Sequence, residues 1–271
     1  LLEGKLKNQV EADRVMVSLA TYLNRMSYRS TPFGLFAGCT VVRWGEEKQI
    51  IFDSNRSKRH TRLDMSFLCA LSTYLASLPQ LSDHIRYYAN STLYHIGDEI
   101  RYVEKVNRDG TKLHQISSIA SSSAIMEVLE CLKKGPTIVE LVDFLAITDI
   151  DKTAARRFII DLIESQVIVS EFEPQLTGME FMFKIANIIE RIASTSGSES
   201  ALQIDTILKK TVALISNLDQ ETPNSHESYE SIQRLLKSLG MPLDKARMFQ
   251  ADLGSSAFEG TIHRHYQSDI H

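Results

Sequence analysis

Two arginines, Arg25 and Arg29, lie four residues apart in the sequence, and Thr31 follows them. In a helix this spacing places both guanidinium groups on one face, about one turn apart. With a hydroxyl beside them, and with Gly34 leaving room for a ligand at the backbone, they are typical of a site for a phosphate or a carboxylate. The alternative is that both arginines only interact with the negative end of the helix dipole.

A basic run further along the chain would extend this site into a patch for a nucleic-acid backbone. Its members are Arg56, Lys58, Arg59, His60 and Arg62. The chain as a whole has a net charge of −4, so a nucleic-acid contact has to come from such a local patch. The alternative is a solvated loop, to which most charge runs belong.

The elements that must position these side chains follow from the spacing of apolar residues. A helix with one apolar face is predicted from residue 10 to 26. Pro32 disfavours helical geometry at the residue before it, so the helix should stop near Ser30. Residues 34–44 and 48–53 predict two strands joined by a Gly-Glu-Glu turn.

A polar, basic loop is predicted for residues 54–64. Asp64, at its end, is well placed to cap a helix over residues 65–78, because an aspartate oxygen can accept from the free N–H groups of the first turn.

Past Pro79 the pattern changes to short strands followed by helices. Three strands, three helices and a closing strand are predicted, in this order, over residues 91–97, 99–106, 112–119, 122–134, 137–146, 151–165 and 167–172. Asp151 is the expected N-cap of the third helix. By its order of elements, the unit from residue 92 to 172 resembles a winged helix-turn-helix.

The remaining chain is predicted to be mostly helical, with one more strand before an irregular tail. The helices span residues 178–194, 200–217 and 226–239, and the strand spans 246–254. The fold class is therefore α+β, with helices and small antiparallel sheets. Four regions are expected: a basic site region over 1–90, the winged-helix-like unit over 91–174, a helical continuation over 175–254, and an irregular tail over 255–271.

Composition fits a soluble globular protein, with 43% hydrophobic and 24% charged residues among 271. Neither a membrane-spanning run nor a secretory signal is found, so we expect a cytoplasmic protein. Because the sequence begins without Met and directly in helical sequence, its true start is expected to be missing. Cys39, Cys69 and Cys131 have no metal-ligand spacing and are expected to be buried thiols.

The run YRSTPFGLFAG at residues 28–38, preceded by Arg25 and followed by TRLDMSFL at 61–68, closely resembles the N-terminal part of the lantibiotic (class I lanthipeptide) dehydratases. The resemblance continues more loosely to FQADL at 249–253. Members of this family are far longer, so the chain would be roughly their first third.

The resemblance implies an activity. These enzymes take glutamate from glutamyl-tRNA and esterify it onto Ser or Thr side chains of a precursor peptide. A second site then eliminates glutamate and leaves dehydroalanine or dehydrobutyrine. Neither a cofactor nor a metal is expected, and glutamyl-tRNA is the co-substrate.

The resemblance also implies roles for particular residues. Arg25, Arg29, Thr31 and Asp64 match residues needed for glutamylation. The arginines would hold the tRNA acceptor end or the glutamyl carboxylate. Thr31 and Asp64 would orient the aminoacyl ester or the acceptor hydroxyl, although Asp64 has helix capping as its alternative. Arg56, Lys58, Arg59 and Arg62 are the expected tRNA-binding residues.

In this family the winged-helix-like unit resembles the element that recognises the leader of the precursor peptide. The leader would add as a further strand along residues 112–119, beside the third helix. The residues assigned to this peptide site are Leu113, Gln115, Ser117, Phe158 and Ile159, with the unit's own core as the alternative. DNA binding is disfavoured, because the third helix carries as many acidic as basic residues.

Two rival functions remain. One is a related ligase that appends an amino acid from aminoacyl-tRNA to a peptide terminus. The other is a scaffold that binds the leader peptide without catalysis. A lanthipeptide cyclase and a second copy of the chain, in a homodimer, are further expected partners.

Overall fold

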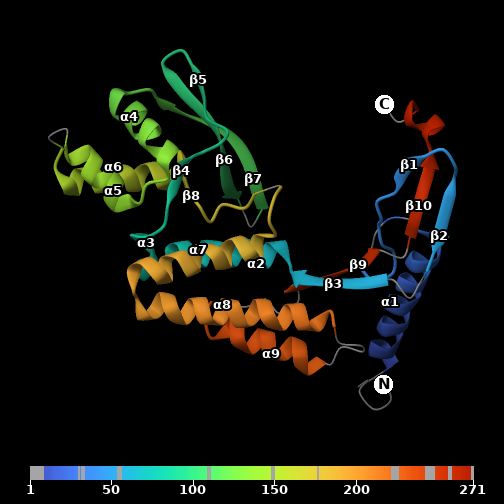
Figure 1. Cartoon of the computed structure of the whole chain (residues 1–271). Coiled ribbons are helices and arrows are strands. Elements are labelled where there is room, and N and C mark those ends of the chain that lie inside the picture. Colours follow the sequence, from blue (N-terminus) through green and yellow to red (C-terminus); the bar gives the residue numbers. More distant parts are fainter. Residues whose placement is uncertain are drawn as a thin grey trace. The chain divides into compact units, whose positions relative to one another are not determined.

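The computed structural model describes residues 9–29, 31, 34–53, 57–108, 111–147, 150–175, 177–220, 226–241, 248–255 and 258–269 (Figure 1). Helices and small sheets make up these residues, which confirms the predicted α+β class. The chain divides into two compact units. Unit 1 consists of Leu1–Asp64, Ile215–Ser228 and Arg247–His271, and unit 2 consists of Met65–Leu214 and Tyr229–Ala246. Unit 1 thus combines both ends of the chain.

The first helix of unit 1, α1 (Gln9–Tyr28), ends where Pro32 predicted. Its last turn continues by one residue, because Arg29 N–H donates to the Arg25 carbonyl at 3.1 Å. The apolar face of α1 is exposed within the described residues, with Leu19 50% and Leu23 58% exposed. The sequence pattern therefore predicted the helix correctly, but not the burial of its apolar face.

The prediction of a basic loop over residues 54–64 is wrong. Residues Ser57–Leu63 form strand β3, which pairs antiparallel with β9 (Phe249–Ser255) over its full length. Thr61 and Leu63 alternate with charged residues and are each only 2% exposed, which is the period of a strand with one buried face. The charge of the run hid this alternation, and the partner strand lies at the other end of the chain.

The prediction of an irregular tail over residues 255–271 is also wrong. It contains strand β10 (Phe258–His263) and a 3₁₀ turn, η4 (Arg264–Gln267). β10 lies between β1 (Arg43–Gly45), to which it is parallel, and β2 (Gln49–Phe52), to which it is antiparallel. The two predicted strands after α1 therefore exist in shorter form, and β10 separates them.

The strands and helices predicted between residues 65 and 172 are present in unit 2. They are α2 (Met65–Ser77), β5 (Tyr94–Ile96), β6 (Glu99–Arg108), β7 (Thr111–Ala120), α4 (Ser123–Cys131) with η2 (Leu132–Lys134), α5 (Ile138–Ala146), α6 (Lys152–Glu164) and β8 (Ile168–Ser170). A short helix, α3 (Pro79–Ser82), and a strand, β4 (Tyr87–Ala89), were not predicted. Strands β5, β6 and β7 form one antiparallel sheet in that order.

Local end signals explain why the three helices after this sheet were predicted well. Gly135 ends η2 with a φ of 64°, a conformation that favours glycine. Thr137 and Glu140 form a capping box at the start of α5. Asp151 caps α6 as predicted, because its side chain accepts from the N–H groups of Thr153 and Ala154.

The winged helix-turn-helix arrangement itself stays a prediction. Strand β8 pairs with β4, which precedes the predicted unit, and not with the sheet of β5, β6 and β7. β4 also contacts the segment before α5, since Tyr87 N–H donates to the Pro136 carbonyl at 2.9 Å.

The three later helices match their predictions: α7 (Phe181–Ser196), α8 (Glu199–Leu218) and α9 (His226–Lys237). The core of unit 2 takes side chains from α2 through α9. Its fully buried members include Leu71, Leu75, Leu81, Ile85, Ile100, Leu132, Leu141, Leu145, Ile159, Ile168, Ile185, Leu208, Ile232 and Leu236. The Tyr74 hydroxyl donates to the Leu239 carbonyl at 2.6 Å and so ties α2 to the residues after α9. None of the three cysteines is buried as expected, and Cys39 is exposed.

Tyr87 gives unit 2 a specific pH dependence. Burial raises the pKa of its phenol to about 12, and the carboxylates of Asp83 and Glu171 act in the same direction. In the unfolded chain the pKa is near its ordinary value of 10.0, so the unfolded state loses its proton first. The stabilisation is complete below about pH 10 and is lost as the pH rises through about 12.

Between about pH 9 and about pH 11, Tyr87 should make the free energy of unfolding fall by about 1 kcal/mol. We therefore expect this fall to be smaller by that amount in Tyr87→Phe. Urea unfolding followed by circular dichroism measures this loss. The control is Tyr88→Phe, since Tyr88 is 40% exposed. An unchanged pH dependence in Tyr87→Phe would contradict the raised pKa.

Candidate functional site

The predicted arginine pair lies at the C-terminal end of α1. Arg25 is half-buried in the last turn and Arg29 is exposed just beyond it. Thr31, two residues after Arg29, is exposed. The three side chains thus occupy the end of one helix, as their spacing predicted.

The glycine-rich segment after the helix fixes this end against strand β9. Leu253 N–H donates to the Gly34 carbonyl at 2.9 Å, and Cys39 forms a parallel bridge with Gly254. A Cβ atom on Gly38 would lie 2.5 Å from the Leu253 carbonyl oxygen, a distance that no side chain tolerates. Glycine at residue 38 is therefore required for the close approach that brings the arginine-bearing end of α1 beside the β3–β9 pair.

Strand β3 divides the predicted basic patch between two faces. Because side chains alternate along a strand, Lys58, His60 and Arg62 share one face and Arg59 lies on the other. Lys58 and His60 are exposed, whereas Arg59 is half-buried. Arg56 lies outside the described residues.

Arg59 is engaged within unit 1. Its Nε lies 3.3 Å from Asp219 Oδ1, with the two side chains 18% and 19% exposed, and its guanidinium also donates to the Leu218 carbonyl. The Thr61 N–H donates to both oxygens of Asp219 at 3.0 Å. Asp219 therefore ties the end of α8 to β3, and this geometry supports a structural role for Arg59 rather than contact with tRNA.

Arg62 belongs to a polar cluster on the exposed face of β3 and β9. Its guanidinium lies 2.9 Å from Asp252 Oδ2. Gln250 donates to the same carboxylate at 3.0 Å and 3.3 Å. The arginine and aspartate side chains are 42% and 36% exposed, so the cluster remains accessible. Sequence reasoning noted the FQADL segment but assigned no role to Gln250 or Asp252, and only the register with β3 reveals their place.

Asp64 lies directly after β3 and before α2. Its N–H donates to the Met248 carbonyl at 2.9 Å, which extends the β3–β9 ladder by one residue. Asp64 is half-buried. Its backbone position agrees with both predicted roles, orientation of a substrate and capping of α2.

The second predicted site lies along β7. Within the described residues this strand has β6 as its neighbour on one side and no strand on the other. Leu113 is 42% exposed. Gln115 and Ser117 both donate to Glu104 on β6, and these hydrogen bonds, that of Ser117 first, hold the pKa of the Glu104 carboxyl below its ordinary value. An edge strand with an exposed apolar side chain is therefore present where peptide addition was predicted.

The α6 residues assigned to the peptide site differ in burial. Phe158 is half-buried, whereas Ile159 is fully buried in the core of unit 2, as its alternative stated.

The cations of α6 have partners. Lys152 pairs with Asp143 at 2.7 Å, Arg156 with Asp83 at 3.1 Å, and Arg157 with Asp161 at 2.9 Å. This pairing agrees with the argument against DNA binding.

Two kinds of feature are missing from the part of the chain that the structure describes. No group of three or more His, Cys, Asp or Glu side chains is arranged to hold a metal ion there. Nor does any of its helices combine the length and the apolar character that crossing a membrane requires.

Comparison with known proteins adds independent findings. Residues 1–265 match a family model described as "Lantibiotic dehydratase, N terminus". The chain is 27% identical over 201 residues to the epidermin biosynthesis protein EpiB of Staphylococcus epidermidis, a match that covers 71% of this chain and 20% of EpiB.

Two solved structures share the fold. The tRNA-dependent lantibiotic dehydratase MibB from Microbispora sp. 107891 matches with a TM-score of 0.70 and 19% identity over 99% of this chain and 26% of MibB. The glutamylation domain TbtB, from thiomuracin biosynthesis, matches with a TM-score of 0.58 and 14% identity over 98% of this chain and 31% of TbtB. The chain therefore spans a third or less of the length of each relative.

Proposed function

Since the chain belongs to the lantibiotic dehydratase family, whose N-terminal region it matches, we propose that it serves the tRNA-dependent glutamylation of Ser and Thr side chains in a lanthipeptide precursor. The observation that carries the proposal is the match over residues 1–265. The exposed end of α1, with Arg25, Arg29 and Thr31 beside the β3–β9 pair, supports it with a suitable anion site.

The proposed step is a transesterification. The Ser or Thr hydroxyl oxygen of the precursor attacks the carbonyl carbon that links glutamate to the tRNA. A new ester forms on the peptide, the bond to the tRNA ribose oxygen breaks, and that oxygen leaves with the proton of the attacking hydroxyl. Arg25 and Arg29 would hold phosphates of the acceptor end or the glutamate side-chain carboxylate, because guanidinium groups bind both bidentately. Thr31 and Asp64 would orient the reacting ester or hydroxyl.

The test is transfer of radiolabelled glutamate from charged tRNA to a cognate precursor, with the full-length gene product that contains this sequence. We expect label on the peptide that hydroxylamine releases, because it cleaves esters. The rival ligase predicts label in a hydroxylamine-resistant amide at a peptide terminus. Leader binding without salt-sensitive tRNA binding, and without transfer, would favour the scaffold.

We also propose that β7 receives the leader peptide as an added strand. Main-chain pairing would supply affinity, and Leu113 an apolar contact. Leu113→Asp should weaken binding of a labelled leader peptide about tenfold, measured by fluorescence anisotropy, because a carboxylate replaces an apolar contact. Ile116→Asp is the matched control, since Ile116 is 68% exposed and lies on the other face of the same strand. Equal losses in both variants would contradict this assignment.

We also propose that the protein acts in the cytoplasm, that it works with a lanthipeptide cyclase, and that two copies of it form a homodimer.

A further inference from the structure

Unit 2 contains an open cleft that none of the roles above uses. It has a volume of about 980 Å³ and lies between β4, β8, the residues after β8, and α7. A hollow of about 380 Å³ adjoins it and shares Lys184 and Ile188 of α7. Each volume lies within the range of small-molecule sites, about 300 to 1000 Å³. Ala89, Val169 and Ile188 provide apolar lining, and Ser91 and Ser170 provide hydroxyls.

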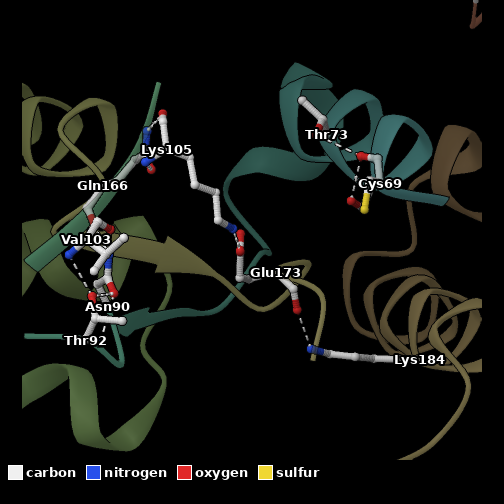
Figure 2. A network of polar contacts seen from close by, with 10 residues as sticks. Cys69, Thr73, Asn90, Thr92, Val103, Lys105, Gln166, Glu173 and Lys184 are labelled. Atoms are coloured by element: carbon white, nitrogen blue, oxygen red, sulfur yellow. Dashed lines mark hydrogen bonds and ion pairs between the residues drawn. The ribbon is translucent and has the colours of Figure 1, made fainter. Parts of the chain in front are cut away.

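Both carboxylates that line the cleft are paired with cations. Glu171 pairs with Arg191 and also accepts from the Arg86 N–H at 2.8 Å. Glu173 pairs with Lys105 (Figure 2). Each acidic charge is therefore balanced by a basic side chain other than Lys184.

Lys184 is the remaining cation of the cleft. Its Nζ donates to the backbone carbonyl of Glu173 at 2.8 Å (Figure 2) and lies 6.0 Å from the centre of the Phe181 ring. An ammonium group has three N–H donors, and the described residues provide that carbonyl as its hydrogen-bond acceptor. Burial lowers the pKa of Lys184, while Glu171 opposes the change. The cleft thus holds one partly desolvated positive charge whose hydrogen-bonding capacity the described residues do not fill.

We propose that this cleft binds a carboxylate-bearing ligand, with Lys184 donating to the carboxylate and the apolar lining holding the rest of the molecule. A monoanion matches the single surplus charge, whereas a phosphate dianion would meet Glu171 and Glu173 at close range. Binding would return the pKa of Lys184 toward its ordinary value, because an opposite charge favours the ammonium form. The site lies in unit 2, whereas the arginine pair lies in unit 1, so neither proposal depends on the other.

The carboxylate could belong to a free organic acid or to a peptide, and the experiment separates these sources. Its probes are butyrate, the blocked peptide acetyl-Ala-Glu-Ala-amide, each a monoanion at neutral pH, and the Gln counterpart of that peptide. Binding to the isotope-labelled chain is followed by the amide chemical shifts of α7. We expect saturable binding of at least one carboxylate probe and none of the Gln peptide.

Variants connect binding to the residues. Lys184→Met should weaken binding about tenfold or more, the loss typical of a charged hydrogen bond, and Lys184→Arg should recover most of it. Ser91→Trp, at an exposed position, should block the cleft without removing a charge. Lys133→Met is the matched control, because Lys133 is 70% exposed and pairs with Glu130 on α4.

Either carboxylate probe binding in a Lys184-dependent manner supports the proposal and identifies its source. Failure of both probes to bind, equal binding of the Gln peptide, or unchanged affinity in Lys184→Met would overturn it. Circular dichroism of each variant confirms that a loss of binding is not a loss of fold.

Discussion

Replacing Arg29 by alanine is expected to lower the rate of glutamyl transfer by about a hundredfold or more, the loss typical of removing one charged donor from a catalytic site. The fold should persist, because Arg29 is exposed beyond the last residue of α1 and alanine favours helices. Single-turnover transfer from labelled glutamyl-tRNA measures the effect. If Arg29 contacts a phosphate, the salt dependence of tRNA binding should also fall by about one counterion.

Arg14 supplies the matched control for this experiment. It is an exposed arginine on the same helix, more than two turns before Arg29, so Arg14→Ala changes the charge of α1 without touching its C-terminal end. Arg29→Lys tests geometry, because lysine keeps the charge but not the bidentate fork. Unimpaired transfer in Arg29→Ala, or the same loss in Arg14→Ala, would refute the role of Arg29 in the site.

The second large effect concerns stability. Asp219→Ala should lower the free energy of unfolding of unit 1 by about 2 to 3 kcal/mol. The substitution removes the partner of the half-buried Arg59 and the acceptor of the Thr61 N–H. Asp219→Asn should cost less, since an amide oxygen can still accept from that N–H. Trp44, the chain's only tryptophan, belongs to unit 1 and reports its unfolding by fluorescence in urea.

The comparison variant is Glu46→Ala, which breaks the exposed ion pair with Arg264, also within unit 1. Its effect should stay within about 0.5 kcal/mol, as is usual for surface pairs. If Asp219→Ala is no more costly than Glu46→Ala, the contact between β3 and the end of α8 does not stabilise unit 1 as we infer.

Local signals made the helices predictable from sequence. The N-cap at Asp151 and the glycine stop at Gly135 each act within one turn of the helix they end, so a short window contains all that is needed. For the same reason the arginine pair at Arg25 and Arg29 could be placed on one helix face.

Strand pairing and ion pairs across the chain could not be predicted in this way. Arg62 and Asp252 are 190 residues apart in sequence, and Arg59 and Asp219 are 160 apart. No local pattern in the basic run distinguishes Arg59, which faces inward, from Lys58, which faces solvent, until the partner strand fixes the face. β10 was missed because its ladder partners lie near the other end of the chain.

The dependence of unit 1 on β9 and β10 affects how the gene can be shortened. A protein that stops before Phe249 keeps every arginine of the proposed site yet loses one strand from each sheet of this unit. The strands left behind would expose unpaired edges, which promote association between molecules. A deletion series aimed at a minimal catalytic fragment therefore has to preserve both of these distal strands, even though none of the assigned catalytic side chains comes from them.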